Sequence, residues 1–123
     1  MTEHPLEIQE VQDDDRLLRR VQFLNPHFIK DDGSPASSSF SLKKGEDGLS
    51  VDIERLTTCE KAILDRNRFR LYFLNASFTK SLGLTNKHDP LPNNYAHALI
   101  KGNITRGIAR QLAQAARRIP YPE

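Results

Sequence analysis

Several stretches of the chain alternate apolar and polar residues, as strands with one buried face do. Residues 49–53 place Leu, Val and Ile on one face and Ser and Asp on the other. Residues 38–43 alternate in the same way, with their Phe and Leu on one face. Turn-forming residues, rich in Gly, Asp and Pro, fill positions 31–35 and 45–48. The pattern predicts a meander of two or three antiparallel strands.

The remaining segments predict a mixture of strands and short helices. Residues 68–74 and 95–100 have strand patterns, and the two prolines within residues 86–94 indicate a loop. Residues 17–24 suit either a helix or a strand, and the sequence does not decide between them. Thr57 and Glu60 fit a capping box, which predicts a helix of about eight to ten residues from there. Residues 77–82 suit one or two helical turns closed by a glycine.

The clearest helical pattern lies near the end of the chain, at residues 104–119. Asn103 is a suitable N-cap for this helix, and Pro120 would end it. At about 100° per residue, the apolar positions of this segment form one stripe. They are Ile104, Ile108, Leu112, Ala115 and Ile119.

Together these elements predict an α+β fold. We expect a small, mainly antiparallel sheet of three to five strands, packed against the C-terminal amphipathic helix, with one or two shorter helices. The chain of 123 residues is the size of one domain, which we place at residues 13–123. Residues 1–12 carry several acids and no lysine or arginine, and we expect a flexible acidic lead-in there.

Composition narrows the class of protein. Hydrophobic residues make up 37% and charged residues 28% of the chain, a balance typical of a globular domain. No apolar run approaches the ~18 residues needed to span a bilayer, and the first residues do not resemble a signal peptide. The single cysteine, Cys59, excludes an internal disulfide and favours a reducing compartment. We therefore expect a cytoplasmic protein with no membrane partner.

Charge is unevenly distributed along the chain. Residues 1–65 hold 14 acidic and 8 basic residues, a sum of −6, whereas residues 66–123 hold 2 acidic and 10 basic residues, a sum of +8. Such a separation of charge along a chain is typical of proteins whose basic half binds a polyanion. The alternative is that the two halves neutralise each other in the fold.

The C-terminal helix is the first candidate for a site. On a helical wheel Arg106, Arg110 and Arg117 fall together opposite the apolar stripe, and three guanidinium groups along one edge suit phosphates. The free N–H groups at the helix start form a natural anion site, with Lys101 and Thr105 as further donors. The competing interpretation is an ordinary solvated face, where arginine is a good helix former.

His97 is the second candidate. It shares a strand face with Tyr95 and Leu99, opposite two small alanines, and imidazole can act as a general acid or base near neutral pH. A structural histidine in or near the core is the alternative. Ser50 and Asp52, on the polar face of their strand, are candidates to join a site.

Other kinds of site have little support in the sequence. The four histidines have no metal-ligand spacing, and a single cysteine cannot form a multi-cysteine zinc site. No GxxxxGK[ST] loop or GxGxxG turn is present, so we expect neither a metal nor a cofactor.

One resemblance covers two short segments. Residues 17–21, followed later by residues 37–40, are similar to the opening of small ADP-ribosyltransferase-like toxins, which place an arginine on a first strand and serines on a later one. No residue here is assigned to the acidic catalytic position of that family, and no role is carried over from it.

Three functions follow from these observations. The first is a binding module that presents its basic C-terminal helix to nucleic acid or another polyanion. The second is an interaction subunit that matches charge patches on an acidic protein partner or a second copy of itself. The third is a small enzyme that cleaves phosphodiesters or acts on phosphate groups, with His97 as acid or base and Lys101 or Arg106 stabilising negative charge.

Overall fold

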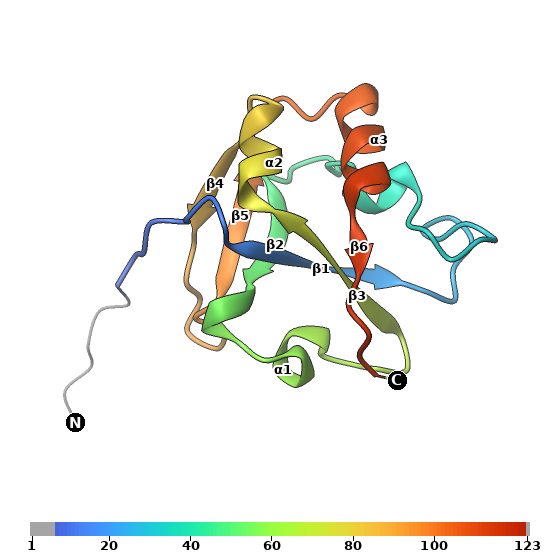
Figure 1. Cartoon of the computed structure of the whole chain (residues 1–123), viewed down its shortest axis with the longest axis horizontal. Helices are drawn as coiled ribbons and strands as arrows, with labels where there is room; N and C mark the ends of the chain where they lie inside the picture. The colour runs from blue at the N-terminus through green and yellow to red at the C-terminus, as the bar shows by residue number, and fades with distance from the viewer. Residues whose placement is uncertain (1–6, 123) are drawn as a thin grey trace.

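A computed structural model describes residues 7–122 of the chain. These residues form one six-stranded antiparallel sheet in the order β4-β5-β2-β1-β3-β6, with three α-helices (Figure 1). In chain order the elements are β1 (Arg16–Gln22), the 3-10 turn η1 (Ser37–Phe40), β2 (Leu49–Ile53), the 3-10 turn η2 (Glu54–Leu56), α1 (Cys59–Ile63), β3 (Phe69–Asn75), α2 (Ala76–Ser81), β4 (Thr85–His88), β5 (His97–Lys101), α3 (Arg106–Ala115) and β6 (Arg117–Arg118). The α+β class and the antiparallel sheet are confirmed, but the expected three to five strands are too few.

The two faces of the sheet carry different groups of apolar side chains. Leu17 and Val51 belong to the larger buried cluster, which also includes Leu112 of α3. Leu18 and Ile63 belong to a smaller cluster on the other side, beside α1. Figure 1 shows α2 and α3 on one side of the sheet and α1 on the other. We call these two sides the α3 face and the α1 face.

The C-terminal helix is shorter than its apolar pattern predicts. It ends at Ala115, and Arg117 and Arg118 pair with β3 as strand β6. The pattern misled because Ile119 is buried in the α1-face cluster, where its N–H donates to the carbonyl of Leu71 at 2.9 Å. The cap is also not Asn103: the side chain of Thr105 accepts the N–H of Ile108.

Two other segments differ from expectation. Residues 38–43 do not form a strand, because Ser38 and Ser39 donate their hydroxyls to the carbonyls of His27 and Phe28 and hold a 3-10 turn. Residues 86–94 are not wholly a loop, since β4 pairs with β5 at the sheet edge. Residues 17–24, which suited either a helix or a strand, lie largely in β1.

The two shorter helices begin near the residues where the sequence predicts them, but α1 has five residues and is shorter than the expected length of about eight to ten. The N-cap of α1 is Thr58, whose side chain accepts the N–H of Lys61, one residue later than the expected cap at Thr57. Helix α2 lies within one residue of the predicted turn at residues 77–82. One or two helices besides the C-terminal one are therefore confirmed.

Residues 1–6 of the predicted acidic lead-in lie outside the described residues. Its described part contacts the β4–β5 edge of the sheet: the Gln9 N–H donates to Nδ1 of His88 at 2.8 Å, and the Tyr95 hydroxyl donates to the Glu7 carbonyl at 2.7 Å. Between residues 7 and 122, we find no helix with both the length and the apolar character needed to cross a bilayer.

Candidate functional site

The centre of the sheet opens next to the pairing of β1 with β2. The two strands pair at Leu17 and Leu18. At the next residue the side chain of Arg19 bridges the strands: its Nη1 donates to the Ser50 carbonyl at 2.8 Å and its Nε to the Ser39 carbonyl at 2.9 Å. Burial lowers the pKa of this guanidinium. Arg19 thus supplies donors to carbonyls at the point where the strands separate.

A cavity of about 600 Å³ lies over this region on the α1 face. The strands contribute Arg20, Ser50 and His97 to its lining, and the segment around α1 contributes Lys61. The full set of lining residues is Arg20, Ser50, Leu56, Thr57, Lys61, Leu64, Leu91, Asn93, Asn94, Tyr95, Ala96 and His97. This set holds two basic side chains, Arg20 and Lys61, and no Asp or Glu. Arg20 is paired with Asp52 behind the wall, whereas Lys61 forms no ion pair with any residue between 7 and 122.

His97 is positioned between a hydroxyl and a carboxylate. Its Nε2 lies 3.3 Å from the Ser50 Oγ, and its Nδ1 lies 3.2 Å from Asp89 Oδ2 and 2.9 Å from the Asp89 carbonyl oxygen. Two acceptors face Nδ1, so the neutral ring carries its proton on that nitrogen and its Nε2 can accept a hydrogen bond from the Ser50 hydroxyl. The imidazole is 12% exposed, whereas the Asp89 side chain is 44% exposed.

The strand register brings the serine and the histidine together. On β2 and β5, Ser50 lies opposite Leu99 and Asp52 lies opposite His97. Ser50 and His97 are therefore diagonal neighbours on one face, a spacing that side chains can bridge. Asp89 reaches the ring from the loop after β4, and its N–H donates to the His97 carbonyl at 2.9 Å.

A second carboxylate, which unlike Asp89 is buried, fixes the position of Arg20 at the cavity wall. Asp52 is 1% exposed; its Oδ2 accepts from Arg20 Nη1 at 3.2 Å and its Oδ1 from Asn94 Nδ2 at 2.8 Å. The same Arg20 nitrogen donates to the Ala62 carbonyl at 2.7 Å. Because Asp52 and α1 both hold this guanidinium, its position at the cavity wall is fixed.

Ser50, His97 and Asp89 together have the hydroxyl, base and carboxylate that a nucleophilic site uses. A hydroxyl faces an unprotonated imidazole nitrogen, and a carboxylate orients the ring through the other nitrogen, which is the arrangement that activates a serine or a water molecule. A fixed guanidinium on the same wall can stabilise negative charge that develops during a reaction.

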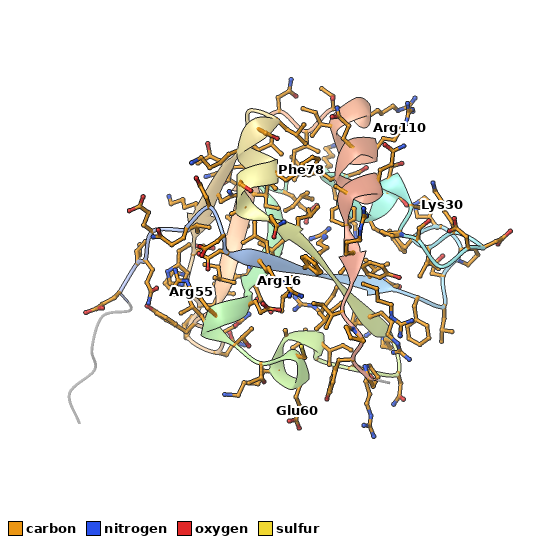
Figure 2. The ribbon with its side chains drawn as sticks, viewed as in Figure 1. Arg16, Lys30, Arg55, Glu60, Phe78 and Arg110 are labelled. Carbon is orange, nitrogen blue, oxygen red and sulfur yellow. The ribbon has the colours of Figure 1, made fainter. Side chains whose placement is uncertain are left out.

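The structure does not bring the predicted anion-binding residues into this site. Lys101 pairs with Asp47 at 2.8 Å, and Thr105 serves as the N-cap of α3. Arg106 and Arg110 are exposed on α3, and neither forms an ion pair with any residue between 7 and 122. Figure 2 shows Arg110 extending away from the sheet.

Arg117 leaves the proposed arginine row. It lies on β6 rather than on the helix, and its Nη1 donates to the carbonyls of Gln114, Ala115 and Ala116 at the end of α3. These bonds satisfy carbonyls that the helix terminus leaves without partners. The row on α3 is therefore reduced to Arg106 and Arg110.

Sequence reasoning missed three residues of the site: Arg20, Asp89 and Asn94. Once residues 16–22 are taken as a strand, alternation places Arg20 on the face opposite Val21, where Ser50 and Asp52 also lie. That signal was available in the sequence. Asp89 and Asn94 lie in the connection between β4 and β5, and no periodicity shows where such a connection folds back.

Other candidates do not add to the site. His27 is exposed, its ring lies against Phe28 at 4.8 Å between centroids, and it is not among the residues that line the cavity beside His97. Within the described part of the chain, no three His, Cys, Asp or Glu side chains gather as a metal site. A scan against protein-family models, a search of curated proteins and a search of solved structures found no match to this chain.

Proposed function

We propose that this protein is a small enzyme that cleaves phosphodiesters or related phosphate esters, with His97 as the general acid and base. The observation that carries the proposal is the position of the His97 ring, between the Asp89 carboxylate at 3.2 Å and the Ser50 hydroxyl at 3.3 Å, in the wall of a cavity. The carboxylate stabilises the imidazolium that forms when Nε2 takes a proton.

The charge of the cavity favours an anionic substrate. Lys61 lines it without an ion pair to any residue between 7 and 122, and Arg20 lines it as the partner of Asp52, so a phosphate group gains favourable electrostatic interactions chiefly with Lys61. Leu56, Leu64 and Leu91 supply an apolar part of the wall. A phosphate ester with an apolar or aromatic organic group, such as a nucleotide, matches both features.

The test uses the full chain and two kinds of substrate, bis(4-nitrophenyl) phosphate and fluorescently labelled single-stranded RNA and DNA. We expect cleavage that falls at least about 100-fold in His97→Ala, the usual contribution of general acid–base catalysis. His27→Ala is the matched control, since that histidine is exposed and away from the cavity. Absence of cleavage, or equal rates for the two variants, would contradict the proposal.

A second candidate function is the binding of nucleic acid, or of an acidic protein partner, through α3. The supporting observation is that Arg106 and Arg110 are exposed and form no ion pair with residues 7–122. Binding of this kind weakens as salt rises, because neutralised phosphates release counterions. The double substitution of both residues with Ala should weaken binding and flatten its salt dependence; unchanged binding would exclude this surface.

A further inference from the structure

We propose that Ser50 is the nucleophile of this site, and that the reaction passes through a covalent phosphoryl-Ser50 intermediate. This inference rests on the proposed function and specifies its chemistry. The alternative within the same function is that His97 activates a water molecule directly and that Ser50 only orients the ring.

The hydrogen bonding of Ser50 differs from that of the other serines near β1. The hydroxyls of Ser38 and Ser39 donate to the backbone carbonyls of His27 and Phe28, which holds their protons away from any base. Ser50 Oγ lies instead 3.3 Å from the Nε2 of His97, a nitrogen that can take its proton. The hydroxyls of Ser38 and Ser39 therefore hold the turn, whereas the hydroxyl of Ser50 on β2 faces a base.

The backbone around Ser50 is held from both sides. Its carbonyl accepts from Arg19 Nη1 at 2.8 Å, and its strand pairs with β5 in the register that places Leu99 opposite it. The side chain is half-buried and lines the cavity, so it is accessible to a ligand there. A nucleophile on a rigid, hydrogen-bonded strand reaches the reacting atom with little loss of conformational freedom.

The first chemical step is a transfer to the serine. His97 Nε2 takes the Ser50 hydroxyl proton while the Oγ–P bond forms and the P–O bond to the leaving alcohol breaks. The proton then passes from Nε2 to the leaving oxygen, so one alcohol is released and Ser50 carries the phosphoryl group. Arg20 lies on the same wall, where its charge stabilises the phosphoryl oxygens in the transition state.

The second step returns the enzyme to its starting state. A water molecule gives a proton to Nε2 and attacks phosphorus, the Oγ–P bond breaks, and Nε2 returns the proton to Ser50. One water molecule is consumed, and the products are an alcohol and a phosphate monoester. No oxidant, metal or other co-reactant is needed to balance either step.

The experiment treats the full chain with diisopropyl fluorophosphate, whose P–F bond breaks as a serine oxygen attacks. Intact-mass spectrometry and peptide mapping identify the adduct. We expect one adduct, on Ser50, absent in Ser50→Ala and formed at least about 100-fold more slowly in His97→Ala. Ser38→Ala is the matched control and should be labelled at the wild-type rate.

The outcomes separate this inference from the proposed function. An adduct on another residue, or a labelling rate unchanged by His97→Ala, overturns the role of Ser50. If the wild type cleaves phosphodiesters in a His97-dependent way while Ser50→Ala retains that activity, water is the nucleophile and only this inference is wrong. If Ser50 is labelled in a His97-dependent way but no phosphate ester is cleaved, the nucleophile stands and the proposed substrate class is wrong.

Discussion

The ion pair beneath the cavity provides a test of how the site is built. Arg20→Met keeps an unbranched apolar stem and removes the guanidinium. Asp52, which is 1% exposed, is then left with the amide of Asn94 as its remaining side-chain partner. The Ala62 carbonyl also loses a donor. Removing one partner of a buried pair costs about 3–5 kcal/mol, because the other charge stays buried.

The cost within that range depends on how much water can still reach the carboxylate of Asp52. The Arg20 side chain is 23% exposed, so water reaches part of the space it vacates and solvates the carboxylate in part. We therefore expect a loss of about 3 kcal/mol in the free energy of unfolding, at the lower end of that range for buried pairs.

Urea denaturation of the wild type and the variant measures this loss. Lys80→Met is the matched control, because Lys80 and Asp13 form an ion pair whose two side chains are 57% and 67% exposed. Such an exposed pair is screened by solvent and contributes little to stability. If Arg20→Met costs no more than the control, Asp52 is not an effectively buried charge, and our account of how the cavity wall is fixed is wrong.

Two further predictions concern groups on the α3 face. Burial raises the pKa of the Tyr72 hydroxyl in the folded protein above its ordinary value of 10.0. The protonated hydroxyl therefore contributes its full share of the free energy of unfolding below pH 10.0, and this share is lost as the pH rises through the pKa of the folded state. Tyr72→Phe should therefore flatten the decline of the urea midpoint above pH 10. It should also cost about 1 kcal/mol at neutral pH, because the Tyr72 hydroxyl donates to the Gly33 carbonyl at 2.7 Å and that hydrogen bond is lost; an unchanged alkaline slope would refute this. Arg19→Lys should lower the free energy of unfolding by about 1–3 kcal/mol. The reason is that an ammonium group cannot donate to both the Ser39 and the Ser50 carbonyl as the planar guanidinium does. A urea midpoint equal to that of the wild type would show that Arg19 does not stabilise the fold by bridging these carbonyls.

Patterns of apolar residues predicted the interior of this fold better than its edges. Strand β2 is present at the residues where Leu49, Val51 and Ile53 alternate, because each of these side chains is buried in one core cluster. The edge strands β4 and β6 contain mainly polar residues, so they carry no apolar alternation. They form because their backbones pair with β5 and β3, whose apolar residues do alternate. The polar residues of β4 and β6 do not show this pairing.

Local hydrogen bonds and tertiary packing overrode two other patterns. Phe40 is fully buried as the alternation implied, but the turn around it is held by side chain to backbone hydrogen bonds of the preceding serines. The apolar spacing of the C-terminal helix continued to Ile119, yet that residue packs on the opposite face of the sheet. Helical periodicity alone cannot show whether an apolar residue continues the buried side of the helix or packs on the other face of the sheet.

The candidate site was predictable in part. Alternation alone placed His97 opposite Ala96 and Ala98, and Ser50 with Asp52 on a polar face. The register that joins them depends on the pairing of β2 with β5, which are separated by more than forty residues of chain. The position of Asp89 depends on how the loop between β4 and β5 folds back, which the sequence pattern did not indicate.

The most direct test of the account is the state of the His97 ring itself. A long-range ¹H–¹⁵N NMR spectrum of the ring nitrogens, recorded during titration with vanadate as a mimic of a phosphoryl group, follows both protonation and binding. We predict a proton on Nδ1 and none on Nε2 in the free protein, and vanadate-dependent shifts of the His97 signals with no change at His27. A proton on Nε2, or His97 signals that vanadate leaves unchanged, would contradict the account.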